Sequence, residues 1–110
     1  MDFIDVHILC EEKAYQMIKE CIEKHNKENN DDFKPDCFKK KENYFVLSWY
    51  SIKWNTALNE IQSIENVLQG LPYDEIGYGF RKIEVSPYKE IIETWNSESI
   101  EPDVERRING

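Results

Sequence analysis

Two histidines and three cysteines are the residues of this chain that could act as nucleophiles or soft metal ligands: His7, Cys10, Cys21, His25 and Cys37. A histidine beside a cysteine can produce the reactive thiolate of a cysteine nucleophile. His7 and Cys10, however, are three positions apart on a predicted strand, where an odd spacing puts two side chains on opposite faces. The spacing predicts that they do not meet, and we expect no catalytic residue.

Cys21 and His25 have the one-turn helical spacing that a metal site can use. The sequence has no second pair at matching spacing and no CxxC pair. Three cysteines are also an odd number, which argues against a disulfide framework. We therefore expect reduced, mostly buried thiols, no metal site and no cofactor.

The segment around Tyr78 contains parts of two nucleotide-binding motifs. Gly77-Tyr78-Gly79 lacks the third glycine of a phosphate loop and the Lys with Ser or Thr that completes it. Tyr78-Gly79-Phe80 has the aromatic and glycine order of an RNA-recognition strand, but no Lys or Arg precedes the glycine. Neither motif is complete, so the segment predicts no nucleotide site.

Neighbouring carboxylates are the remaining candidates for chemistry. Asp74 with Glu75 falls in a predicted turn, and Glu98 with Glu101 falls in the tail. The sequence places no apolar pocket around either pair that would prepare a carboxyl group for acid–base catalysis. We therefore expect solvated carboxylates and a protein that is not an enzyme.

Hydrophobic periodicity predicts the elements that position these residues. Alternating apolar side chains indicate strands, and apolar residues at three- and four-residue steps indicate amphipathic helices. Pro87 can begin a short last helix. The predicted strands are residues 3–9, 33–38, 44–54 and 75–85, and the predicted helices are residues 11–26, 55–71 and 88–95.

This order predicts an α+β fold of the ferredoxin-like β-α-β-β-α-β type with an added short C-terminal helix. Right-handed crossovers would place both main helices on one face of an antiparallel sheet. We expect residues 1–95 to form a single domain, and residues 96–110 to be an acidic tail for which the sequence predicts no order. Many unrelated functions use this fold, so the site must decide the function.

Negative charge is concentrated in the second half of the chain. The net charge is −8: residues 1–55 carry 11 acids and 9 bases, residues 56–105 carry 11 acids and 3 bases, and Arg106 and Arg107 supply two positive charges. Such a field repels nucleic-acid phosphates and steers a basic protein toward the molecule. We expect no direct nucleic-acid binding and a basic protein partner.

The ends of the chain and its apolar runs bear on its location. Acids stand near the N-terminus, where a signal peptide would need a basic region, and no apolar run approaches the roughly 18 residues of a membrane span. We expect a soluble, cytoplasmic protein without a membrane partner.

The predicted partner-binding surface consists of acids with one aromatic residue. Carboxylates can imitate nucleic-acid phosphates or meet the Arg and Lys side chains of a nucleic-acid-handling enzyme, with aromatic residues as anchors. The residues of this surface are Glu60, Glu65, Asp74, Glu75, Tyr78, Glu84, Glu90 and Glu93. The alternative interpretation is that these negative charges serve only to keep the protein soluble.

The strand Trp49–Trp54, the helix Asn55–Leu71 and the run from Tyr78 to Ile83 resemble small acidic accessory proteins encoded by phages and prophages. The resemblance covers about residues 40–90 and departs after Ile83, where Val85-Ser86-Pro87 replaces further acids. Such proteins include anti-CRISPR and other anti-defence inhibitors. The resemblance implies an inhibitor in the host cytoplasm that binds a nuclease or another nucleic-acid-binding complex without catalysis.

Other functions remain open from the sequence. An immunity or antitoxin protein that blocks the active site of a toxin uses the same electrostatics with a different partner. A homodimeric scaffold is another possibility, with residues 44–54 as its seam. An enzyme or metal-binding protein that uses the cysteines and histidines is a further alternative.

Overall fold

The computed structural model describes residues 3–98 and 100. These residues form two helices and one five-stranded antiparallel sheet, so the fold is α+β. The elements are β1 (Ile4–Cys10), α1 (Glu12–Asn29), β2 (Cys37–Lys40), β3 (Phe45–Ile52), α2 (Asn59–Gly70), β4 (Phe80–Val85) and β5 (Ile91–Trp95). The strand order across the sheet is β2-β3-β1-β4-β5, and all neighbouring strands are antiparallel.

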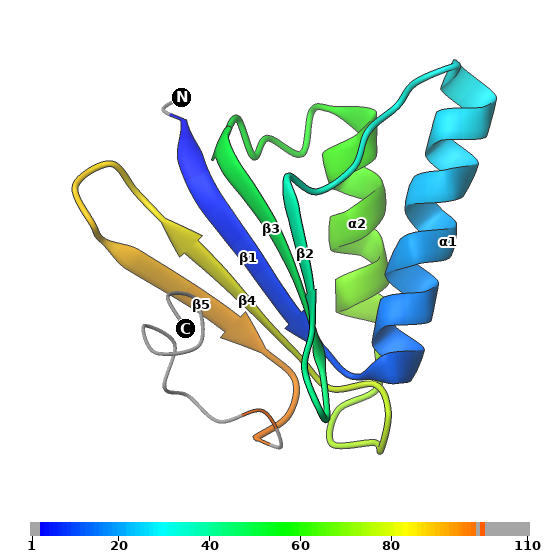
Figure 1. The fold of residues 1–110 in the computed structure, drawn as a ribbon, viewed down its shortest axis with the longest axis vertical. Coiled ribbons are helices and arrows are strands. Elements are labelled where there is room, and N and C mark those ends of the chain that lie inside the picture. The colour runs from blue at the N-terminus through cyan, green and yellow to red at the C-terminus, as the bar shows by residue number, and fades with distance from the viewer. Residues whose placement is uncertain (1–2, 99, 101–110) are drawn as a thin grey trace.

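The main core lies between the sheet and the two helices, which Figure 1 shows on the same side of the sheet. Alternate strand residues point to this side, and each helix turns an apolar stripe toward them. Buried residues of this core include Val6, Ile8 and Cys10 of β1, Ala14, Ile18 and Ile22 of α1, Leu47 and Trp49 of β3, Ile61, Ile64 and Leu68 of α2, and Phe80 of β4.

The opposite face of the sheet has a smaller core. Leu9, Val46 and Ile83 from the three central strands pack with Ile100, and all four are buried. Arg81 donates a hydrogen bond from Nε to the carbonyl oxygen of Ile100 at 2.5 Å. Residue 100 of the predicted tail therefore contributes to a core, whereas residues 99 and 101–110 lie outside the described residues.

The ends of both helices differ from the predicted ones for local reasons. Helix α1 continues to Asn29 because Asn30 takes the left-handed conformation and donates its backbone N–H to Asn26, a common way to end a helix. Helix α2 begins only at Asn59 because the preceding residues form a turn. In that turn the side chain of Asn55 accepts a hydrogen bond from the Ala57 amide.

The predicted C-terminal helix is wrong, because residues 91–95 form strand β5 instead. The amide of Ser86 donates to the carbonyl of Glu90, Lys89 takes a left-handed conformation, and the Ser86 hydroxyl accepts the Glu90 amide. This turn folds the chain back onto β4 and makes a hairpin. The β-branched residues after it suit a strand, and this preference outweighs the helix-starting role assigned to Pro87.

Two predicted strands are shorter in the structure. Residues 33–36 precede β2, because the side chain of Asn26 bonds both the amide and the carbonyl of Phe33 and fixes a loop there. Residues 75–79 precede β4 in a loop in which Gly77 has a φ of 92°. A Cβ at Gly77 would come within 2.9 Å of the Lys13 side chain, so this turn requires glycine.

Candidate functional site

Three of the eight predicted surface residues are neutralised by the bases of β4. Glu65 of α2 accepts hydrogen bonds from Lys82 Nζ at 2.5 Å and from Trp54 Nε1 at 2.8 Å. Glu84 lies 3.8 Å from the same Lys82 ammonium, and Glu93 forms an ion pair with Arg81. Both bases are buried, so these carboxylates compensate internal charge and hold α2 and β5 to β4.

The other five predicted residues are distributed over three places. Glu60 lies on the helix layer beside His25. Asp74, Glu75 and Tyr78 belong to the loop between α2 and β4, where the Tyr78 ring lies under the Lys13 ammonium and packs on the main core.

Glu90 is exposed in the hairpin between β4 and β5, at the end of the sheet opposite that loop (Figure 1). The structure therefore does not bring the eight residues into one patch.

The predicted separation of His7 and Cys10 agrees with the β1 geometry. The Nδ1 atom of His7 lies 2.7 Å from the Ser48 hydroxyl on the face away from the helices, whereas Cys10 is in the main core. Burial raises the pKa of the Cys10 thiol far above its ordinary value, which disfavours the thiolate. Burial likewise raises the pKa of the Cys21 thiol. Neither residue is prepared to act as a nucleophile.

The surface that sequence reasoning missed is the edge formed by β5. This strand is the outermost of the sheet beside β4, and its outer edge has no strand partner among residues 3–98 and 100. Ile91 is 48% exposed, Ile92 is 64% exposed and Trp95 is 48% exposed. An edge strand with several exposed apolar side chains is unusual, because natural proteins normally protect such edges.

The outer edge of β5 also has backbone groups available for pairing. Ser86 bonds to Glu90 and Asn96 bonds to Phe80 across the hairpin, so the even-numbered residues of β5 form the hydrogen-bonded pairs with β4. The N–H and C=O groups of Ile91, Glu93 and Trp95 consequently point away from the sheet. A further strand would find three residues of ladder there.

A pocket of about 460 Å³ lies beside β5, between this strand and the end of α2. Its apolar wall includes Leu68, Leu71 and Phe80, and the exposed Tyr73 stands at its rim. Lys82 and Glu65 supply a polar but internally paired wall. The pocket can accept an apolar side chain from a chain that pairs with β5.

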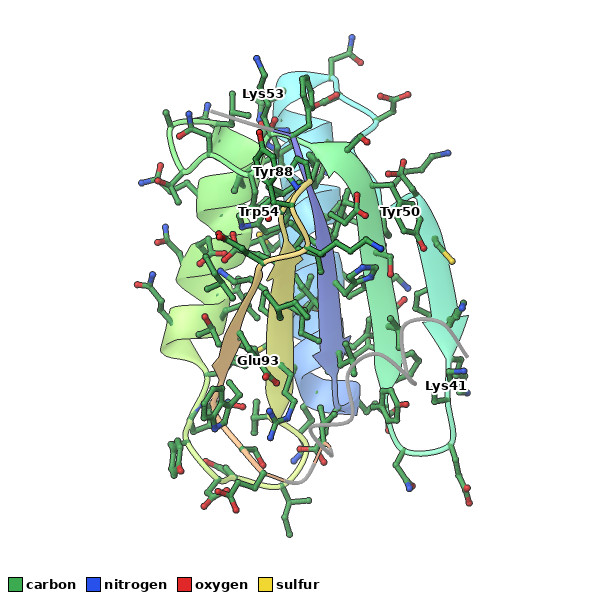
Figure 2. The ribbon with its side chains drawn as sticks, turned by 90° about the vertical axis from the view of Figure 1, so that its left-hand side faces the viewer. Lys41, Tyr50, Lys53, Trp54, Tyr88 and Glu93 are labelled. Carbon is green, nitrogen blue, oxygen red and sulfur yellow. The ribbon has the colours of Figure 1, made fainter. Side chains whose placement is uncertain are left out.

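Exposed carboxylates flank β5 at both ends. Glu90 directly precedes the strand, and the amide of Asp74 donates to the carbonyl of Asn96 just after it, which places Asp74 beside the other end. Tyr88, 84% exposed, extends from the hairpin, as Figure 2 shows. We call the following exposed residues the β5 surface: Tyr73, Asp74, Tyr88, Glu90, Ile91, Ile92 and Trp95.

Among the described residues, neither helix has the length and apolar character needed to cross a membrane. Comparisons of the chain with protein-family models, with curated proteins and with solved structures find no match.

Proposed function

We propose that this protein is a non-enzymatic inhibitor that binds a basic protein through the β5 surface. The observation that carries the proposal is an edge strand that no other described strand covers, whose apolar side chains are exposed and whose two ends are flanked by carboxylates. Strand addition to a sheet edge is a common way to bind an extended segment of another protein.

The backbone of β5 and the pocket beside it have separate roles in this proposal. The outward N–H and C=O groups of Ile91, Glu93 and Trp95 pair with the main chain of the partner, which supplies affinity without regard to sequence. The pocket next to Leu68 and Phe80 then selects a partner with an apolar side chain at the matching position.

Charge supports a basic partner. The chain has a net charge of −8, and the described ends of β5 carry Asp74 and Glu90 with only Lys89 as a nearby base in the hairpin. Such a surface attracts a cationic protein and accelerates the encounter. A basic surface that normally contacts nucleic acid, as in a nuclease complex, would be blocked by this attachment.

This class of function is the one that the resemblance to phage anti-defence proteins implies, and we propose the cytoplasm of the host as its location. An immunity protein bound to a basic toxin would use the same surface, and the identity of the partner distinguishes the two.

A second copy of this chain is a weaker candidate for the occupant. Antiparallel pairing of two β5 strands would bring the hairpin of each copy against Asp74 and Glu75 of the other, and would join two chains that each carry −8. In the seam expected at residues 44–54, β3 lies between β2 and β1, so residues 45–48 are paired on both sides and offer no free edge.

The finer fold assignment is also a proposal. We assign β1 to β4 with both helices to a ferredoxin-like unit, to which β5 is added at one edge. The order β2-β3-β1-β4 with antiparallel neighbours supports this assignment, as does the packing of both helices in one core. In this assignment the proposed binding edge belongs to the added strand β5 and not to the ferredoxin-like unit.

The experiment is affinity capture of proteins from a heparin-binding cell fraction, which is enriched in basic proteins. The wild-type chain is compared with Ile91→Pro, which removes an outward N–H without removing a bond to β4. Met17→Ala on the exposed face of α1 is the control. We expect a protein that wild type and control retain, that rising salt releases, and that Ile91→Pro fails to retain.

Retention of the same proteins by wild type and Ile91→Pro would overturn the proposal, provided that circular dichroism shows both chains folded. Light scattering tests whether a second copy of this chain occupies the β5 edge instead. A wild-type dimer that Ile91→Pro converts to a monomer would assign the edge to a second copy and remove the case for a basic partner.

A further inference from the structure

A second site, independent of the β5 surface, lies where the C-terminal end of α1 meets the first turn of α2. His25 is 8% exposed, and its Nε2 atom lies 2.9 Å from Asp31 Oδ2 and 3.9 Å from Glu60 Oε2. The three ligand atoms lie within 4.8 Å of one another. One imidazole and two carboxylates from three separate segments thus converge on one point.

The spacing of these atoms fits a metal ion. Zinc bonds to imidazole nitrogen and carboxylate oxygen are about 2.0–2.2 Å long, so two ligand atoms of one tetrahedral ion are roughly 3.3–3.6 Å apart. The separation of His25 Nε2 from Asp31 is already close to this range. The Glu60 carboxylate lies 3.9 Å from His25 Nε2 and must approach that atom by roughly 0.5 Å to enter this range, which a glutamate side chain can do by rotation.

The charge at this point is also unbalanced. The ion pairs of Asp31 and Glu60 within residues 3–98 and 100 both involve His25, whose imidazole carries at most one positive charge against two negative ones. The negative end of the α1 dipole attracts a cation and the positive end of the α2 dipole opposes it, so the two carboxylates supply the attraction.

The space beside the cluster is open. A groove of about 570 Å³ between the helices is lined by His25 itself and by polar residues that include Asn59, Gln62 and Ser63. A three-ligand site next to a polar groove leaves room for water or an exogenous ligand on the metal, as in open zinc sites.

We propose that His25, Asp31 and Glu60 bind a divalent transition-metal ion of the zinc type, which joins α1, the loop after it and α2. An imidazole with two carboxylates suits zinc, iron or manganese, whereas softer ions such as Cu(I) prefer thiolate ligands. Cys21 lies one helical turn from His25 and also lines the groove, but its sulfur is not part of the cluster.

Binding requires a change of tautomer at His25. The amide nitrogen of Asn29 lies 3.3 Å from Nδ1, which therefore accepts, while Nε2 carries the proton that Asp31 receives in the hydrogen bond. The metal takes the Nε2 lone pair, so the proton moves to Nδ1. The Asn29 amide nitrogen also donates to the His25 carbonyl at 2.9 Å, so the amide must give up this hydrogen bond to turn its oxygen toward the new Nδ1–H.

The test is titration of the full chain with zinc, followed by calorimetry and by the nitrogen resonances of the histidine rings. The chain has two histidines, so His7 serves as an internal reference. We expect one zinc ion per chain, a shift of the His25 resonances alone, and a higher Tm with excess zinc. Zinc that moves neither ring, or moves both equally, would contradict the proposal.

Matched variants locate the ion. Glu60→Gln and Asp31→Asn keep the shape of each side chain and should each weaken zinc binding at least about tenfold. Glu28→Gln lines the same groove but lies outside the cluster, and should bind zinc as the wild type does. If Cys21→Ser abolishes binding while Glu60→Gln does not, the ion belongs to the thiol and the proposed site is wrong.

Discussion

The two edge strands of the sheet differ in ways that bear on function. β2 has only four residues, includes Lys39 and Lys40, and is preceded by Pro35. β5 has the sequence Ile-Ile-Glu-Thr-Trp, without a lysine or a proline. Short length, lysine and proline are the devices by which proteins prevent a sheet edge from pairing with another chain. The β2 edge is therefore protected, whereas the β5 edge is open within residues 3–98 and 100.

The aromatic residues at the two edges also behave differently. Phe38 of β2 stacks on Phe45 and contacts Tyr15, so its ring belongs to a cluster within the molecule. Trp95 of β5 is exposed to the same fraction as Phe38, 48%, but its ring contacts the Arg81 guanidinium and, among the described residues, belongs to no aromatic cluster. The two aromatic residues therefore differ in their contacts and not in their exposure, and Trp95 resembles the large aromatic anchors of interfaces.

The largest expected effect is loss of the residue that holds β5. Arg81→Ala removes the ion pair with Glu93 and the hydrogen bond to the Ile100 carbonyl, and leaves Glu93 without its base. Because a partly buried charge is left uncompensated, we expect the free energy of unfolding to fall by about 3 kcal/mol. Unfolding in urea measures this change in the free energy of unfolding.

The β2 edge supplies the control for that experiment. Lys40→Ala removes an exposed base whose ammonium lies 5.9 Å from the Phe45 ring centroid, and should cost less than about 1 kcal/mol. Equal losses for the two variants would show that β5 is not specially dependent on Arg81.

The next effect concerns binding. Ile91→Lys gives β5 the chemistry of β2, and we expect the partner retained by the wild type to bind at least about tenfold more weakly, which corresponds to roughly 1.4 kcal/mol. Titration with the captured partner measures the affinity. Lys40→Ile, which removes a lysine from β2, should change it less than about twofold, and a comparable loss in both variants would end the distinction between the edges.

A smaller effect is expected from the charge beside β5. Glu90→Lys reverses an exposed carboxylate at one end of the strand, and should weaken the complex by about 0.5–1 kcal/mol at low salt and by less at high salt. Glu28→Lys on α1 changes the net charge equally but lies away from β5. Association rates at several salt concentrations compare the two, and identical behaviour would leave only a general effect of net charge.

The smallest expected effect is the pH dependence of stability that arises from His7, which lies in the buried centre of the sheet and not at either edge. Burial lowers the pKa of His7 below its ordinary value, so the unfolded chain binds a proton in a pH range where the folded chain does not. Stability should therefore decrease as the pH falls below about 6.5. His7→Gln should reduce this slope in urea unfolding between pH 7 and pH 5, whereas an unchanged slope would exclude His7 as its source.

Much of the fold could be predicted from short-range patterns. The alternation in β1 and β3 and the stripe of Ile61, Ile64 and Leu68 in α2 specify their elements, because burial on one face imposes the period of the structure. β5 could not be predicted in the same way. Its five residues follow a proline that suits a helix start, and only pairing with β4 decides that they are extended.

The candidate site was predicted in part. The sequence identified the acids and their excess over bases, but not which of them are compensated. Glu65 and Glu93 meet Lys82 and Arg81 only because β4 lies between α2 and β5. The cluster of His25 with Asp31 and Glu60 also depends on tertiary structure, because no sequence spacing predicts that these three side chains meet.

By itself the sequence determined the α+β class, the helical and strand periods of the longer elements and the negative net charge, because these depend on local pattern and composition. The tertiary structure alone decided which carboxylates are neutralised, which edge is open and where a histidine meets two acids. These features depend on residues far apart in the chain, and the order of strands in the sheet brings them together or keeps them apart.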